Sequence, residues 1–214
     1  MFGEIHFTTV SSADEVRQIV DLQAANLPAA LTPDTIASQG FVTVRHDLGV
    51  LERMNQAAPG IIAKDGGRVV GYALVMLRQF AADVPVLQPL FQILDGLSWK
   101  RGLLGDLPLW FVMGQVCIAE GYRGRGLFDG LYRAMAEEYR DRYDFTVTEV
   151  SVRNTRSQRA HARVGFERLH VYQDATTGDE WHVIALDFTT SRDLVHRVAP
   201  ASPPRAQLSP RGRR

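Results

Sequence analysis

The strongest structural signal in the chain is WFVMGQVCIAEGYRGRGLFDG, which runs from Trp110 to Gly130. It opens with an apolar run to Ala119, which is typical of a buried strand. A glycine-rich turn follows, and from Leu127 onward apolar residues recur at helical spacing, which predicts an amphipathic helix. Gly114 inside the strand indicates a bulge or a close approach of another backbone. The stretch therefore predicts a strand, a tight turn and a helix in succession.

The turn between strand and helix consists of Arg123, Gly124, Arg125 and Gly126. Its glycines carry no side chain that would block a ligand, and the helix N-terminus adds partial positive charge where backbone N–H groups converge. The two arginines raise the local potential further. A Walker loop would need Gly-Lys-Ser/Thr, which is absent, and the dinucleotide fingerprint would need a glycine where Asp129 stands. The turn predicts a pyrophosphate as its ligand.

Patterns on either side of this stretch predict a mixed α/β domain with one central sheet. The expected elements are a strand over 5–10, helices over 12–25, 33–40 and 47–54, a hairpin over 61–77, a strand over 145–152, a helix over 155–164 and a hairpin over 166–188. The connection over 80–109 is long for a compact domain, so we expect an insertion that covers the core or a lid. Residues 189–214 are rich in proline and arginine, and we expect a disordered tail after a single domain over 1–188.

The composition narrows the class of protein. The chain has 214 residues, of which 24 are basic and 24 acidic, so it has no general electrostatic reason to bind nucleic acid or an anionic membrane. Its one cysteine, Cys117, excludes an intrachain disulfide, and neither a secretory signal nor a long apolar run is visible. We therefore expect a cytoplasmic protein. The histidines have no ligand-like spacing, so no metal site is predicted.

Two blocks of sequence carry a resemblance to a known family. Tyr122–Leu127 is similar to the pyrophosphate-binding segment of the GCN5-related N-acetyltransferases (GNAT), Arg/Gln-x-x-Gly-x-Gly/Ala. The second block is similar to that family's Asn-x-x-Ala…Tyr-x-x-x-Gly-Phe segment at matching spacing, with Asn154, Ser157, His161, Gly165 and Phe166. The resemblance implies the GNAT fold, a mixed central sheet flanked by helices. It also implies an acetyltransferase that depends on acetyl-CoA.

The resemblance assigns a cofactor site. A strand would pair its backbone with the pantetheine arm and direct an amide at the thioester oxygen, while the turn would bind the diphosphate and the second block would contact the cofactor or fix the turn there. The cofactor-binding residues implied are Val116, Cys117, Ile118, Arg123, Gly124, Arg125, Gly126, Leu127, Phe128, Asn154 and Ser157. Phe128 departs from the usual glycine or alanine, so its ring either packs beneath the loop or narrows the site. Cys117 is expected to pack and not to react, because no histidine neighbour is visible to activate it.

Two residues are candidates for catalysis. His161 replaces the tyrosine that commonly protonates the departing thiolate, and an imidazolium could do the same; the alternative is a histidine that packs at the helix face. Glu149 lies in an otherwise apolar strand, where it could face the cleft and act as the general base, directly or through water; the alternative is a glutamate that faces an edge of the sheet or forms a salt bridge.

The resemblance implies direct attack of an amine on the thioester, with a primary amine of a small molecule as the expected acceptor. Acetylation of a protein lysine or N-terminus stays open, as does a catalytically silent acyl-CoA-binding module. The expected partners are acetyl-CoA and an amine acceptor, without nucleic acid or membrane, and a homodimer stays open. A closed lid over 80–109 would favour a small acceptor, and an open groove would favour a peptide.

Overall fold

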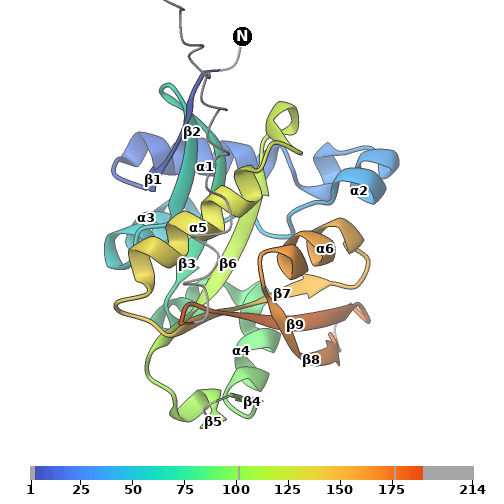
Figure 1. Ribbon diagram of the computed structural model, residues 1–214. Helices are drawn as coiled ribbons and strands as arrows, with labels where there is room; N and C mark the ends of the chain where they lie inside the picture. The colour runs from blue at the N-terminus through green and yellow to red at the C-terminus, as the bar shows by residue number, and fades with distance from the viewer. Residues whose placement is uncertain (1–2, 101, 176, 190–214) are drawn as a thin grey trace, which may run out of the picture.

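A seven-stranded mixed sheet forms the centre of the computed structural model, which describes residues 3–100, 102–175 and 177–189 (Figure 1). The strands lie in the order β1-β2-β3-β6-β7-β9-β8. Neighbours are antiparallel except β6 and β7, which are parallel. The strands are β1 (Ile5–Thr9), β2 (Ile61–Asp65), β3 (Arg68–Met76), β6 (Trp110–Ile118), β7 (Phe145–Ser151), β8 (Glu167–Gln173) and β9 (Glu180–Asp187). The predicted fold class is confirmed.

Six α-helices surround this sheet in the described part of the chain. They are α1 (Ala13–Ala24), α2 (Pro33–Gln39), α3 (Leu48–Ala57), α4 (Gln88–Leu94), α5 (Leu127–Tyr139) and α6 (Thr155–Arg163). Ser12, Thr32, Asp47 and Asn154 begin four of them, because each side chain accepts a hydrogen bond from an N–H of the first turn. Sequence patterns therefore placed these helix starts correctly.

Two apolar layers hold the helices to the sheet. One lies under α1, α3 and α4 and includes Ile19, Leu51 and Leu90. The other lies under α5 and includes Leu131 and Met135. Alternate residues of a strand face opposite layers, so Val147 joins the first layer and Val150 the second. Figure 1 shows α5 crossing the sheet on one side and α1 with α3 on the other.

The long connection between β3 and β6 folds against the core. It forms short 3₁₀ turns, α4, and a two-stranded ribbon of β4 (Ser98–Trp99) and β5 (Gly102–Leu103). Trp99 packs edge-on against Phe145 of β7, with ring centroids 4.7 Å apart, and the Trp110 indole donates to the Leu104 carbonyl. The apolar side of this connection is therefore part of the core.

The central strands diverge where the sheet changes direction. β7 pairs with β6 at Trp110, Phe111 and Val112. In the described residues, the remainder of β6 pairs with β3 alone. On the β3 side the register shifts between Ala73 and Val75, at the level of Gly114. The predicted irregularity at Gly114 is thus confirmed as a bulge. Most of the predicted tail, residues 190–214, lies outside the described residues.

Candidate active site

Within the residues that the structure describes, the fork between β6 and β7 leaves one edge of β6 without a partner strand from Met113 to Ile118. Backbone groups of this stretch that point away from β3 face the gap. An unpaired strand edge carries a row of N–H and C=O groups that can bind an extended ligand. The fork is thus shaped to hold a linear molecule by its main chain.

A cavity of about 460 Å³ opens at this fork between β6, α5, α6 and the segment after α2. All the predicted cofactor-binding residues line it except Arg125, whose guanidinium lies over the Tyr122 ring, 5.9 Å from its centroid. The two sequence blocks, more than 25 residues apart in the chain, therefore meet across one cavity. A cavity of this size suits a ligand of cofactor dimensions.

The glycine turn has the backbone that an anion needs. Gly124 and Gly126 have φ of 75° and 78°, in the left-handed region that favours glycine, and a Cβ at either would meet nothing within 4 Å. Gly126 precedes α5 and offers no side chain to cap it. The first N–H groups of α5, from Leu127 onward, are thus left for a ligand, and Leu127 and Phe128 line the cavity.

The side chain of Arg123, the first residue of this turn, is anchored by hydrogen bonds. Its Nε donates to the Ile118 carbonyl at 3.0 Å, and one terminal nitrogen donates to the side-chain oxygen of Asn26. The other terminal nitrogen is buried and has no hydrogen-bond partner in the described chain. A buried N–H without a partner costs free energy, so this nitrogen fits a ligand that supplies an acceptor.

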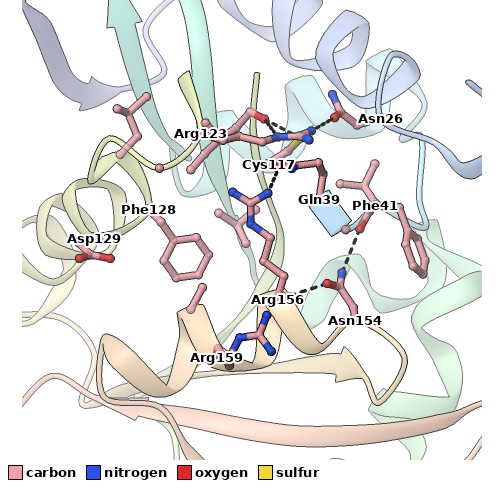
Figure 2. A pocket seen from close by; sticks show the side chains of 18 of the residues that line it. Asn26, Gln39, Phe41, Cys117, Arg123, Phe128, Asp129, Asn154, Arg156 and Arg159 are labelled. Carbon is pink, nitrogen blue, oxygen red and sulfur yellow. Dashed lines mark hydrogen bonds between the residues drawn. The ribbon is translucent and has the colours of Figure 1, made fainter. Parts of the chain in front are cut away.

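The opposite wall begins at Asn154. Its Oδ1 accepts from the Ser157 N–H at 3.1 Å, and its Nδ2 reaches the Phe41 carbonyl at 3.5 Å. A Cβ at Gly40 would lie 2.7 Å from Asn154 Oδ1, and Gly40 has φ of 76°, so glycine is required there. Asn154 therefore fixes both the start of α6 and the segment that crosses the open end of the fork (Figure 2).

A second cavity, of about 80 Å³, lies closer to where β6 and β7 meet. Phe41, Val42, Val116, Asn154 and Ser157 line both cavities, so the two adjoin. Leu87 and Leu90 of the long connection close one side of the smaller cavity. Its single charged lining residue among those described is Glu149.

The carboxyl of Glu149 has a raised pKa. Burial raises the pKa of its carboxyl to about 7, against an opposing hydrogen bond from the Tyr172 hydroxyl, which donates to Oε2 at 2.5 Å. Asp174 raises the pKa further through its charge. A carboxyl that titrates near neutrality can accept a proton and release it under ordinary conditions.

His161 lies on the other face of the sheet, at the margin of the smaller cavity and almost fully buried. Its Nδ1 is 2.9 Å from the Ser157 carbonyl, which can only accept, so Nδ1 carries the proton. Nε2 then accepts from the Tyr132 hydroxyl at 2.8 Å. Burial lowers the pKa of His161 to about 4, so the ring is neutral at pH 7 and both nitrogens are occupied.

Phe128 and Cys117 have defined surroundings. The Phe128 ring packs edge-on against His161, with centroids 5.0 Å apart, and against Tyr132 at 4.9 Å. It also lines the larger cavity, so it both packs beneath the loop and borders the site. Burial raises the pKa of the Cys117 thiol to about 11, which keeps it protonated at neutral pH.

Several lining residues were not anticipated from the sequence. Arg156 and Arg159 of α6 line the cavity, and their spacing with Arg163 would have revealed a basic face on that helix. Asn26 and Gln39 gave no signal, because they are brought to the site by contacts with residues far along the chain.

Within the described ranges, no group of three or more His, Cys, Asp or Glu side chains is arranged to hold a metal ion. None of the helices in these ranges is both long and apolar enough to cross a membrane.

A parallel strand pair that separates, with a helix N-terminus facing the gap, marks the chain as a protein that can hold a long anionic ligand by main chain. Comparison with known proteins specifies the class. The sequence model of the acetyltransferase (GNAT) family matches residues 34–166, more than half of the chain. The protein therefore belongs to the acetyltransferase (GNAT) family, which makes it an acyltransferase that depends on acetyl-CoA. No curated protein matches the sequence.

Solved structures share the fold at low identity. A Salmonella typhimurium protein, solved with its cofactor acetyl-CoA, has a TM-score of 0.55 and 16% identity, over 86% of this chain and 94% of its own. A GNAT-family acetyltransferase from Bacillus cereus has a TM-score of 0.56 and 13% identity, over 86% and 98%. The Escherichia coli N-acetyltransferase for the alanine of a ribosomal protein has a TM-score of 0.51 and 13% identity, over 86% and 94%.

Proposed function

We propose that this enzyme transfers the acetyl group of acetyl-CoA to a primary amine of a small molecule, by direct attack in a ternary complex. The observation that carries the proposal is Glu149, a carboxyl with a pKa of about 7 in a small cavity that adjoins the larger one. An amine arrives protonated and attacks only after it loses that proton. A base with a pKa near neutrality suits this step.

The larger cavity accounts for the cofactor in this proposal. The N–H groups at the start of α5 and the Arg123 side chain bind the diphosphate, and the free edge of β6 pairs with the pantetheine arm. The thioester then points toward the junction with the smaller cavity. A backbone N–H of Val116–Ile118 stabilises the oxyanion, because a fixed dipole needs no reorganisation as charge develops.

Glu149 and His161 have different tasks in this mechanism. Glu149, directly or through a water, takes the proton of the amine on the sheet face covered by α1, α3 and α4, the face that also holds Val147. His161 positions Ser157 and Tyr132, since a neutral ring with both nitrogens occupied has no proton to give readily. The departing thiolate takes its proton from solvent, since an ordinary thiol with a pKa of about 8.5 needs no dedicated acid.

The long connection favours a small acceptor over a protein. Leu87 and Leu90 form a wall of the smaller cavity and are themselves part of the core, so this side is closed. A structural neighbour is an N-acetyltransferase for an alanine of a ribosomal protein, so peptides belong in the test. Because the closed wall leaves little width for a peptide backbone, we expect small amines to be the better substrates.

The test is a two-substrate kinetic measurement that follows release of free CoA thiol. A panel of small primary amines and of peptides with free N-termini or lysines is compared, for wild type and for Glu149→Gln. Glu120→Gln, an exposed carboxylate change outside both cavities, is the control. We expect turnover with small amines, intersecting initial-rate lines, and loss of about 10²–10⁴-fold in kcat in Glu149→Gln alone.

Other outcomes would overturn parts of the proposal. Parallel initial-rate lines for the wild type, together with loss of activity in Cys117→Ala, would show a ping-pong route through the Cys117 thiol. Turnover of peptides alone would replace the acceptor class. Cofactor binding without acetylation of any compound in the panel would contradict the small-amine function.

A further inference from the structure

Four arginine side chains line the larger cavity. Arg156, Arg159 and Arg163 are spaced three and four residues apart on α6, so they lie along one face of that helix. Arg123 approaches from the β6 side, as Figure 2 shows together with Arg156 and Arg159. Among the described lining residues, Asp129 supplies the single carboxylate. The cavity therefore carries a clear excess of positive charge.

Three of these arginines already have protein partners. Arg163 forms an ion pair with Asp129, with a shortest N–O distance of 2.6 Å. Arg123 is held by Asn26 and the Ile118 carbonyl, and Arg156 donates to the Gln39 side chain.

Arg159 differs from the other three. It is exposed at the cavity wall, and within the described chain its guanidinium makes no hydrogen bond or ion pair. All five of its N–H donors are therefore open to a ligand.

The charges in the cavity act on one another. Burial, and then the charges of Arg123 and Arg159, lower the pKa of the Arg156 guanidinium. Like charges held together without a counter-ion destabilise the empty protein, and an anion that binds among them removes this cost. The arrangement thus favours a ligand with more than one anionic group.

We propose that Arg159 binds the ribose phosphate of acetyl-CoA, the one that stands apart from the diphosphate. This assignment rests on the proposed use of the cofactor. The diphosphate is accounted for by the start of α5 and by Arg123, whereas Arg159 projects from α6 on the other wall (Figure 2). An exposed guanidinium matches a monophosphate at the solvent end of the ligand, where it can bind two phosphate oxygens at once.

Calorimetric titration with two cofactors tests the assignment. The wild type, Arg159→Gln and Arg133→Gln are each titrated with acetyl-CoA and with acetyl-dephospho-CoA, which lacks the ribose phosphate. Arg133 is an exposed arginine of α5 outside both cavities, so its substitution removes the same charge elsewhere. Thermal melting of each variant verifies that it is folded.

A specific pattern is expected. Arg159→Gln weakens the binding of acetyl-CoA about 10–100-fold, which is the range for the loss of a charge-assisted pair, and changes the affinity for acetyl-dephospho-CoA by no more than about twofold. Arg133→Gln changes neither by more than about twofold.

Each other pattern contradicts the assignment. An equal loss of affinity for both cofactors would place Arg159 at the diphosphate or the adenosine. Unchanged affinity for both would show that Arg159 does not contact the cofactor. The assignment stands apart from turnover: if the pattern holds but no amine is acetylated, the acceptor proposal fails and the role of Arg159 remains. If the wild type binds neither cofactor, both fail.

Discussion

Replacing Tyr172 by phenylalanine should move the pH dependence of acetyl transfer to higher pH. The Tyr172 hydroxyl donates to Glu149 Oε2 and lowers the pKa of that carboxyl, while burial raises it, and the balance is about 7. Without the hydroxyl, burial acts unopposed on the carboxylate. The base then needs a higher pH to lose its proton.

The size of the shift follows from the strength of the lost bond. A hydrogen bond to a charged group contributes about 1.5–3 kcal/mol, and about 1.36 kcal/mol corresponds to one pKa unit. Tyr172 is half-buried, so we take the lower end, a shift of about one unit. The ionised fraction of Glu149 at pH 7 would then fall about fivefold, and kcat/KM with it.

The assay is kcat/KM for a saturable amine from about pH 5.5 to about pH 9.5. For Tyr172→Phe the rising limb should move up by about one unit, and the rate at high pH should approach that of wild type. Tyr143→Phe is the control, because Tyr143 packs beside Phe111 in the apolar layer under α5, on the sheet face opposite Glu149, and lines neither cavity. An unmoved limb, or one moved to lower pH, would refute the assignment of Glu149 as the base.

Three further changes test the site. Glu149→Gln should raise the free energy of unfolding at about pH 8 by up to about 3 kcal/mol. The buried Glu149 carboxyl has a pKa of about 7 in the folded protein and 4.5 when exposed, so its ionisation destabilises the fold as the pH rises from 4.5 through 7, and Gln cannot ionise. Equal stabilities of the two proteins at about pH 8 would contradict this. Gly126→Ala should keep the fold but weaken acetyl-CoA binding by about tenfold or more in calorimetry, because its φ of 78° disfavours a side chain and the added methyl enters open space at the turn. His161→Ala should lower the free energy of unfolding by about 3 kcal/mol in urea, since it empties a packed aromatic site and leaves the Tyr132 hydroxyl without its acceptor. The limb assigned to Glu149 should not move in His161→Ala.

The sequence predicted the elements and the turn because these depend on local chemistry. The alternation in β6, the glycines at 124 and 126 and the cap at Asn154 each act within a few residues. Periodicity and capping are therefore readable from one chain.

Long-range contacts at the site were not readable. Asn26 meets Arg123 across 97 residues, and Tyr172 of β8 reaches Glu149 of β7 past the strand between them. His161 is neutral because burial among rings from other elements lowers its pKa, so its position in the motif suggested an acid that its surroundings do not support. Such features depend on packing between elements, which local patterns do not record.

The short contact between β6 and β7 also has a mechanical consequence. In the described residues, three residue pairs join strands β1-β2-β3-β6 to strands β7-β9-β8, so the two halves of the sheet are connected over a short length only. Each half carries one side of the larger cavity, because α5 packs on the first half and α6 on the second. A cofactor that lies between the two halves would hold them at a fixed angle, so we expect the cofactor-bound enzyme to be stiffer than the free enzyme and the width of the smaller cavity to depend on whether the cofactor is bound.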